Sequence, residues 1–296
     1  MQIYPIIQLL RIPVSYYLTP VFLFAFSMAG TWNYENSILL FIALHLFIYP
    51  ASNAYNSFMD QDVSSIGGLK NPPKAGKEVL YVSILFDFIG LWICYYLSAG
   101  LCYAVLVYVL ASRMYSWHGI RLKKYALLSF LTVVFFQGAY IFSIVYVFCQ
   151  NISFSEAILQ ENYAMPALIS SLIAAGIYPL SQVYKHKSDA KAGIQSFSMW
   201  LGIRGTFEFS AICFAAVALL MGYHFIGSNQ SHLFYVFIIF LFPVMAYFLW
   251  WAGKVWNDPK QTNYRYTMLF NKFASSFLNL YFISVFVIKN LPELPI

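Results

Sequence analysis

The stretch Asn53-Ala-Tyr-Asn56-Ser-Phe-Met-Asp60-Gln-Asp62 lies at the end of an apolar run, residues 37–59, that is long enough to cross a bilayer. Polar side chains at the mouth of a membrane helix cost free energy to desolvate, so their presence there indicates a function. Asn56 and Asp60 are four residues apart and Asn53 lies three residues earlier, which places all three on one helix face. Oxygen ligands of this kind suit a hard cation such as Mg²⁺, completed by the phosphates of a substrate. The stretch therefore predicts a binding site at a helix end.

Composition places this stretch in a membrane protein. The chain is 61% hydrophobic and 9% charged, whereas an ordinary soluble domain has roughly a quarter charged residues. Nine apolar runs have the length of a membrane span: residues 12–31, 37–58, 80–98, 100–116, 126–149, 165–184, 206–226, 232–253 and 267–288. Because irregular backbone cannot face lipid, we predict an all-α bundle of nine transmembrane helices that forms a single domain over residues 1–296.

The distribution of positive charge gives the expected orientation. Of the 17 Lys and Arg residues, only Lys289 falls on one predicted side. The others lie at Arg11 or after the second, fourth, sixth and eighth runs: Lys70, Lys74, Lys77, Arg113, Arg121, Lys123, Lys124, Lys185, Lys187, Lys191, Arg204, Lys254, Lys260, Arg265 and Lys272. The positive-inside rule then predicts a cytoplasmic N-terminus and a polar cytoplasmic cap. We interpret residues 1–10 as an amphipathic lead-in and not as a cleaved signal peptide.

Two other features carry little chemistry. The four cysteines lie in or beside apolar runs without a C-x-x-C pair, so we expect packing residues and neither disulfides nor zinc ligands. The net charge of +6 is explained by orientation and by anionic lipid at the cytoplasmic leaflet, so no nucleic acid is expected. Nothing in the sequence indicates an obligate protein partner.

The predicted cytoplasmic loops hold the candidate chemistry. The loop after the second run begins with Asp60 and Asp62, and the loop after the sixth run contains Lys185, Asp189 and Lys191. The loop after the fourth run contains Arg121 and Lys123, which could grip phosphate oxygens. An acidic segment after the second run and another after the sixth suggest a duplicated bundle in which both segments face one cavity.

At these positions the chain resembles the UbiA superfamily of intramembrane prenyltransferases. The family pattern N-D-x-x-D-x-x-x-D lies on residues 56–64, and its D-x-x-x-D-x-x-x-G pattern lies on residues 185–193. The segment from Tyr115-Ser116 to Arg121-Leu-Lys123, followed by Gln137-Gly138, is similar to the family's Y-S-x-x-x-x-R-L-K…Q-G segment. These matches occur in the family's order and at the corresponding helix ends over nearly the whole chain.

The resemblance implies a prenyltransferase with a nine-helix bundle and a site for an isoprenyl diphosphate and Mg²⁺. The prenyl group would pass to a lipophilic, aromatic acceptor within the membrane, in quinone, pigment or related lipid biosynthesis. The catalytic carboxylates would be Asp60, Asp62 and Asp189, which would hold the metal together with Asn56. The diphosphate would be bound by Asn56, Arg121, Lys123, Lys185 and Lys191. The expected location is the bacterial inner membrane, with the site facing the cytoplasm.

Departures from the family pattern leave the number of metal ions open. Ser64 stands where the first pattern has its last acid, and Lys185 stands where the second pattern has its first acid. Fewer carboxylates reduce the attraction for two Mg²⁺ ions, and Lys185 could instead pair directly with pyrophosphate. A one-metal site and a catalytically silent relative are both compatible with these residues.

Three other functions remain possible from the sequence. A transporter should have its binding residues near the bilayer midplane on broken helices, whereas ionisable residues here concentrate at one helix end. A membrane terpene cyclase would use the same diphosphate site without an acceptor. If the chain were a silent isoprenoid-binding protein, Asp60→Asn and Asp189→Asn would leave the cellular lipid profile unchanged.

Overall fold

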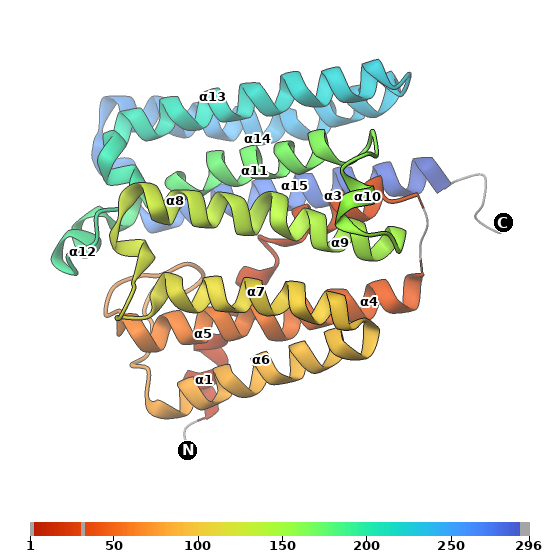
Figure 1. The fold of residues 1–296 in the computed structure, drawn as a ribbon. Helices are drawn as coiled ribbons and strands as arrows, with labels where there is room; N and C mark the ends of the chain where they lie inside the picture. Colours follow the sequence, from red (N-terminus) through yellow and green to blue (C-terminus); the bar gives the residue numbers. More distant parts are fainter. Residues whose placement is uncertain (1–2, 31–32, 291–296) are drawn as a thin grey trace. The chain divides into compact units, whose positions relative to one another are not determined.

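The computed structural model describes residues 3–30 and 33–290, which are helical without any named strand. Nine helical segments of this described part are long and apolar enough to cross a membrane, as predicted (Figure 1). They are Tyr4–Met28, Tyr34–Asp60, Lys77–Leu97, Ala99–Ser116, Ala126–Gln150, Ala164–Lys191, Phe197–Gly227, Ser231–Asn257 and Tyr264–Asn290. Residue 31, the end of the first predicted run, lies outside the described residues.

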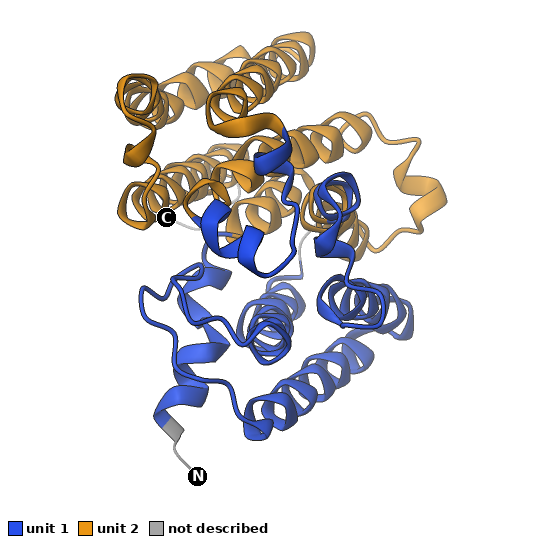
Figure 2. Cartoon of the chain, turned by 90° about the vertical axis from the view of Figure 1, so that its left-hand side faces the viewer, with its two compact units in different colours: residues 1–17, 32–132, 185–200 blue, residues 18–31, 133–184, 201–296 orange. Residues whose placement is uncertain are grey.

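The chain divides into two compact units, each built from separate stretches of sequence (Figure 2). Unit 1 comprises residues 1–17, 32–132 and 185–200, and unit 2 comprises residues 18–31, 133–184 and 201–296. The expectation of a single domain stays a prediction.

Unit 1 contains the polar stretch of residues 53–62. Its elements are α1 (Ile3–Leu10), α2 (Ile12–Ser15), α4 (Tyr34–Ile42), the π-helical turn η1 (Ala43–Ile48), α5 (Tyr49–Asp60), α6 (Lys77–Leu97), α7 (Ala99–Ser116), η2 (Leu122–Lys124), the start of α8 (Ala126–Val134), α12 (His186–Lys191) and the start of α13 (Phe197–Gly227). Helices α5, α6 and α7 pack against one another, and α1 packs against α5 and α6. Buried Leu9 of α1, Ala54 of α5 and Val79 of α6 belong to one apolar cluster.

The predicted lead-in and first helix are separated by a break at Arg11. This residue has φ 47° and ψ 41°, in the left-handed region that interrupts a right-handed helix. Its guanidinium donates to the carbonyl oxygens of Asn53, at 3.1 Å, and Gly67, at 3.3 Å. Arg11 therefore connects the N-terminal helix to α5 and to the loop that follows it.

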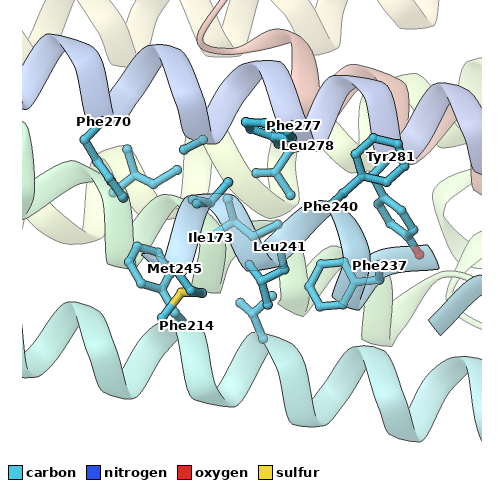
Figure 3. Close-up of a pocket in the computed structure, with 14 residues that line it drawn as sticks. Ile173, Phe214, Phe237, Phe240, Leu241, Met245, Phe270, Phe277, Leu278 and Tyr281 are labelled. Atoms are coloured by element: carbon cyan, nitrogen blue, oxygen red, sulfur yellow. The ribbon is translucent and has the colours of Figure 1, made fainter. Parts of the chain in front are cut away.

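Unit 2 contains the remaining helical residues. Its elements are α3 (Thr19–Met28), the end of α8, η3 (Phe135–Tyr140), α9 (Ile141–Gln150), α10 (Phe154–Ala157), α11 (Ala164–Leu180), η4 (Val183–Lys185) up to residue 184, α13 from residue 201, α14 (Ser231–Asn257), η5 (Pro259–Gln261) and α15 (Tyr264–Asn290). Helix α15 packs against α3 and α14, and η3 packs against α11. Figure 3 shows an apolar pocket lined from α11, α13, α14 and α15 by side chains such as Phe214, Met245 and Phe270.

Gly138 is required by the close approach of η3 to α11. A Cβ atom at this position would lie 2.5 Å from the Cα atom of Ser171, a backbone atom that cannot move aside cheaply. The hydroxyl of Ser171 donates to the carbonyl oxygen of Val134 and accepts from the backbone N–H of Ala139. The glycine of the Gln137-Gly138 pair thus lets the hydroxyl of Ser171 bond to the backbone of a neighbouring membrane helix at a helix irregularity.

Candidate functional site

The end of α5 positions the first two acidic side chains. Asp60 is the last residue of the helix, and Gln61 turns the chain with φ 50° and ψ 41°. The side-chain amide of Gln61 donates to the carbonyl oxygens of Phe58 and Ala75, each at 2.9 Å. One residue therefore ends the helix and holds both ends of the following loop. Asp62 follows this turn, and its side chain is half-buried.

Asp60 is held by two cations from the loop between α7 and α8. Its Oδ1 atom contacts the Nζ atom of Lys123 in a hydrogen-bonded ion pair, and the Nη2 atom of Arg121 lies 3.8 Å away. Arg121 has φ 50°, a left-handed turn that begins η2 and carries the next residues back toward α5. Lys123 is 5% exposed, which is low for a lysine and fits a fixed partner.

Asp189 and Lys185 come from the segment between α11 and α13. Lys185 ends η4, and Asp189 lies one helical turn later on α12. The Nζ atom of Lys185 lies 3.8 Å from Oδ1 of Asp189 and 3.9 Å from Oδ1 of Asp62. The ammonium group therefore faces one carboxylate from each of the two acidic segments that the sequence predicted to share a site.

Local backbone structure holds this segment in place. Gly193 ends α12 with φ 66°, and the N–H of Ile194 donates to the carbonyl oxygen of Asp189 at 2.9 Å. This is a left-handed helix cap, which favours glycine because a Cβ atom is strained at that φ. The N–H of Gln195 then donates to the carbonyl oxygen of Lys124 at 3.2 Å. The cap and this bond join the α12 segment to the loop that carries Arg121 and Lys123.

Burial opposes charge at two of these groups. Burial raises the pKa of Asp62, and the ammonium of Lys185 offsets part of this rise. Burial also lowers the pKa of Lys123, and the neighbouring carboxylate of Asp60 counteracts it. Desolvation favours the neutral form of each group, so the charged forms are maintained by ion pairs across the site. Perturbed titratable groups gathered in one place are typical of functional sites.

Two predicted residues are not drawn into these ion pairs. Asn56 is partly exposed one turn before Asp60, with no hydrogen-bond partner for its side chain among the described residues. Lys191 is exposed on α12 and forms no ion pair within the described part of the chain. Asn56 and Lys191 are close in sequence to the paired acids Asp60 and Asp189. A ligand bound at these acids would have to extend to Asn56 and Lys191 to contact them.

Sequence reasoning missed the roles of Arg11 and Gln61. Arg11 was assigned only to the charge bias, yet it hydrogen-bonds to α5 and to the following loop, and its charge counters the raised pKa of Asp62. Its signal was the interruption of an apolar run by a single cation. Gln61 had no sequence signal, because its function depends on a left-handed backbone conformation and on Ala75, 14 residues away.

The donor set fits a hard divalent cation that is completed by a substrate. Asp60, Asp62 and Asp189 offer only oxygen atoms, which is the ligand type that Mg²⁺ prefers. Among residues 3–30 and 33–290, no three His, Cys, Asp or Glu side chains are gathered as a preformed metal cage. Mg²⁺ is commonly bound through one or two carboxylates with phosphate oxygens, so a cage is not required.

A comparison with family models identifies the family of the chain. The model of the UbiA prenyltransferase family matches residues 17–275 of the chain. The chain belongs to the UbiA prenyltransferase family. A search of curated proteins finds no match. The nine spans together with this membership make the chain a multi-pass integral membrane protein and a member of a prenyltransferase family.

Solved structures share the UbiA fold. A UbiA homolog from Archaeoglobus fulgidus bound to GPP and Mg²⁺ has a TM-score of 0.66 and 17% identity, covering 95% of this chain and 99% of that one. The apo structure of a UbiA homolog from Aeropyrum pernix K1 has a TM-score of 0.70 and 14% identity, covering 93% and 97%. A structure from a study of digeranylgeranylglyceryl phosphate synthase has a TM-score of 0.60 and 15% identity, covering 96% and 97%. The predicted all-α, nine-helix fold and the UbiA resemblance are confirmed.

Proposed function

We propose that this protein transfers a prenyl group from an isoprenyl diphosphate to a lipophilic, aromatic acceptor within the membrane, with Mg²⁺ as cofactor. The observation that carries the proposal is the cluster in which three carboxylates face three cations from loops far apart in sequence. The solved homolog bound to DMAPP and Mg²⁺ supports the same class of substrate and metal.

The charges of the cluster suit a diphosphate with a divalent cation. Asp60, Asp62 and Asp189 are balanced by Arg121, Lys123 and Lys185, so the ion pairs alone leave no excess positive charge for a polyanion. A bound Mg²⁺ would supply that charge and would neutralise the leaving pyrophosphate. The residues we assign to the metal are Asn56, Asp60, Asp62 and Asp189.

The chain's own residues would bind and orient the diphosphate. We assign this role to Asn56, Arg121, Lys123, Lys185 and Lys191. Arg121 can present a bidentate fork to phosphate oxygens, whereas lysines act as compact point charges. With the diphosphate fixed, the allylic C–O bond breaks and its electron pair leaves on pyrophosphate. The acceptor ring then forms a new carbon–carbon bond to the allylic carbon, and the proton of the ring passes to the released pyrophosphate or to water. Preorganised cations stabilise the charge that develops on the leaving group.

The orientation follows from the predicted loops. We place the cluster at the cytoplasmic face of a bacterial inner membrane, with the N-terminus inside, because almost all lysines and arginines fall on that side. The acceptor and the prenyl chain would enter from the bilayer, and quinone or pigment biosynthesis would use the product. We assign no protein partner.

The direct test uses the full chain in membranes with Mg²⁺, C10 to C40 isoprenyl diphosphates and a panel of aromatic acceptors. We expect a prenylated acceptor with the natural chain and its loss in Asp60→Ala and Asp189→Asn. Glu161→Gln is the matched control, because Glu161 is an exposed acid outside the cluster. Pyrophosphate release with a hydrocarbon product but no conjugate would refute transfer and favour a terpene cyclase. Diphosphate binding without turnover would instead indicate a silent isoprenoid-binding protein.

A further inference from the structure

We infer that the ammonium group of Lys185 serves as a built-in cation between the two acidic segments, in the place where a second metal ion would otherwise be needed. The inference rests on the proposed function, since it concerns how the same site holds a diphosphate. It assigns Lys185 a role beyond binding one phosphate oxygen, and it sets the metal content of the site at one ion per chain.

The first argument is the position of the ammonium. Its Nζ atom lies 3.9 Å from Asp62 Oδ1 and 3.8 Å from Asp189 Oδ1, so it is committed to neither carboxylate more than to the other. An ammonium has three N–H donors and no acceptor. Two donors can face the carboxylates, and the third can be given to a phosphate oxygen. The ammonium therefore offers positive charge to the same oxygen groups that would hold a divalent ion.

The second argument is the charge left if Lys185 is removed. Asp62 and Asp189 share the Lys185 ammonium as a cation within 4 Å, and their side chains are only 19% and 9% exposed. Asp60 cannot share its cations freely, because Lys123 and Arg121 are already placed against it. Without the Lys185 ammonium, two like charges would face each other and would need another cation.

The third argument is how the lysine is fixed. Lys185 lies one turn before Asp189, and the Gly193 cap and the bond from Gln195 to the Lys124 carbonyl anchor the rest of the segment. The backbone structure of this segment therefore positions the ammonium in the cluster. By contrast Lys187, two residues later on α12, is exposed and forms no ion pair among the described residues.

The experiment counts metal ions directly. The full chain in detergent is titrated with Mn²⁺ in the presence of saturating inorganic pyrophosphate, and free Mn²⁺ is measured by electron paramagnetic resonance. We expect about one Mn²⁺ per natural chain and about two in Lys185→Asp, which adds a carboxylate and removes the ammonium. Lys187→Asp, the matched control, should stay at one. Two ions in the natural chain, or one in a folded Lys185→Asp variant, would overturn the inference.

A second pair of variants protects the test against misfolding. Lys185→Arg keeps the positive charge and should keep one Mn²⁺ per chain. Lys185→Gln keeps much of the side chain without the charge, and its pyrophosphate affinity at saturating Mn²⁺ should fall roughly tenfold. Unchanged affinity in Lys185→Gln would refute the inference. Absence of any pyrophosphate-dependent Mn²⁺ binding in the natural chain would refute the proposed function itself, which separates the two failures.

Discussion

The ion pair between Asp60 and Lys123 allows structural and catalytic roles to be separated by a double-mutant cycle. In Asp60→Asn, Lys123 keeps its charge in a site where it is 5% exposed but loses its carboxylate. Removing one partner of a buried pair costs about 3 kcal/mol, because the remaining charge is uncompensated. In Asp60→Asn with Lys123→Met, that charge is also gone, so most of the stability should return.

The second cation on Asp60 loses its partner in both variants. Arg121 lies 3.8 Å from Asp60, which corresponds to a Coulomb attraction of about 4 kcal/mol at an effective dielectric constant of 20. Arg121 is 24% exposed and Lys123 is 5% exposed, so solvent screens much of the Arg121 attraction and its loss should be smaller than the cost at Lys123.

The assay is equilibrium unfolding in mixed detergent micelles, followed alongside prenyl transfer in the same preparations. Asp60→Asn should lose both stability and activity, and the double variant should regain stability but not activity. Glu161→Gln should be unchanged in both. If the double variant is as unstable as Asp60→Asn, then Lys123 is not the source of the cost, and the reasoning from a buried ion pair is wrong.

Three further predictions concern single features of the fold. Gly138→Ala should cost about 1–3 kcal/mol of stability by overpacking against the Ser171 backbone, whereas Gly205→Ala, which meets only Leu201 Cβ at 3.6 Å, should cost less in the same unfolding assay. Arg11→Met removes two hydrogen bonds and should increase amide exchange in residues 64–70, and equal exchange in variant and natural chain would contradict the proposed link. The N–H and hydroxyl of Ser153 donate to Glu156 and lower its pKa below 4.5. Protection of the α10 amides from exchange should therefore be full above pH 4.5 and should be lost as the pH falls through the lowered pKa. Glu156→Gln should abolish this pH dependence in exchange experiments.

The sequence predicted the spans and the acidic segments well because both signals are local. A run of about 20 apolar residues is sufficient to indicate a membrane helix, and all nine runs correspond to helical segments. The spacing of Asn56 and Asp60 likewise depends only on helix geometry. The two acidic segments do meet in unit 1, as their similar placement after the second and sixth runs indicated.

The partners of the acids could not be predicted, because partner choice depends on tertiary packing. Lys123 and Lys191 look alike in sequence, yet Lys123 is buried against Asp60 and Lys191 is exposed. The left-handed turns at Arg11, Gln61 and Arg121 were equally hidden, because non-glycine residues rarely adopt that conformation and carry no turn signature. These three turns determine where the loops return to the helices.

The division of unit 1 into separate stretches has a consequence for biosynthesis. Asp60 and Lys123 both lie within one continuous part of the unit, residues 32–132, so their pair can form early, while later spans are still being inserted. Asp62 must wait for Lys185, more than a hundred residues later, and closing so long a loop is an entropic cost that falls late in assembly. A chain halted before residue 185 would thus hold Asp62 without the ammonium of Lys185, with only the charges of Arg11 and Lys123 to offset its burial.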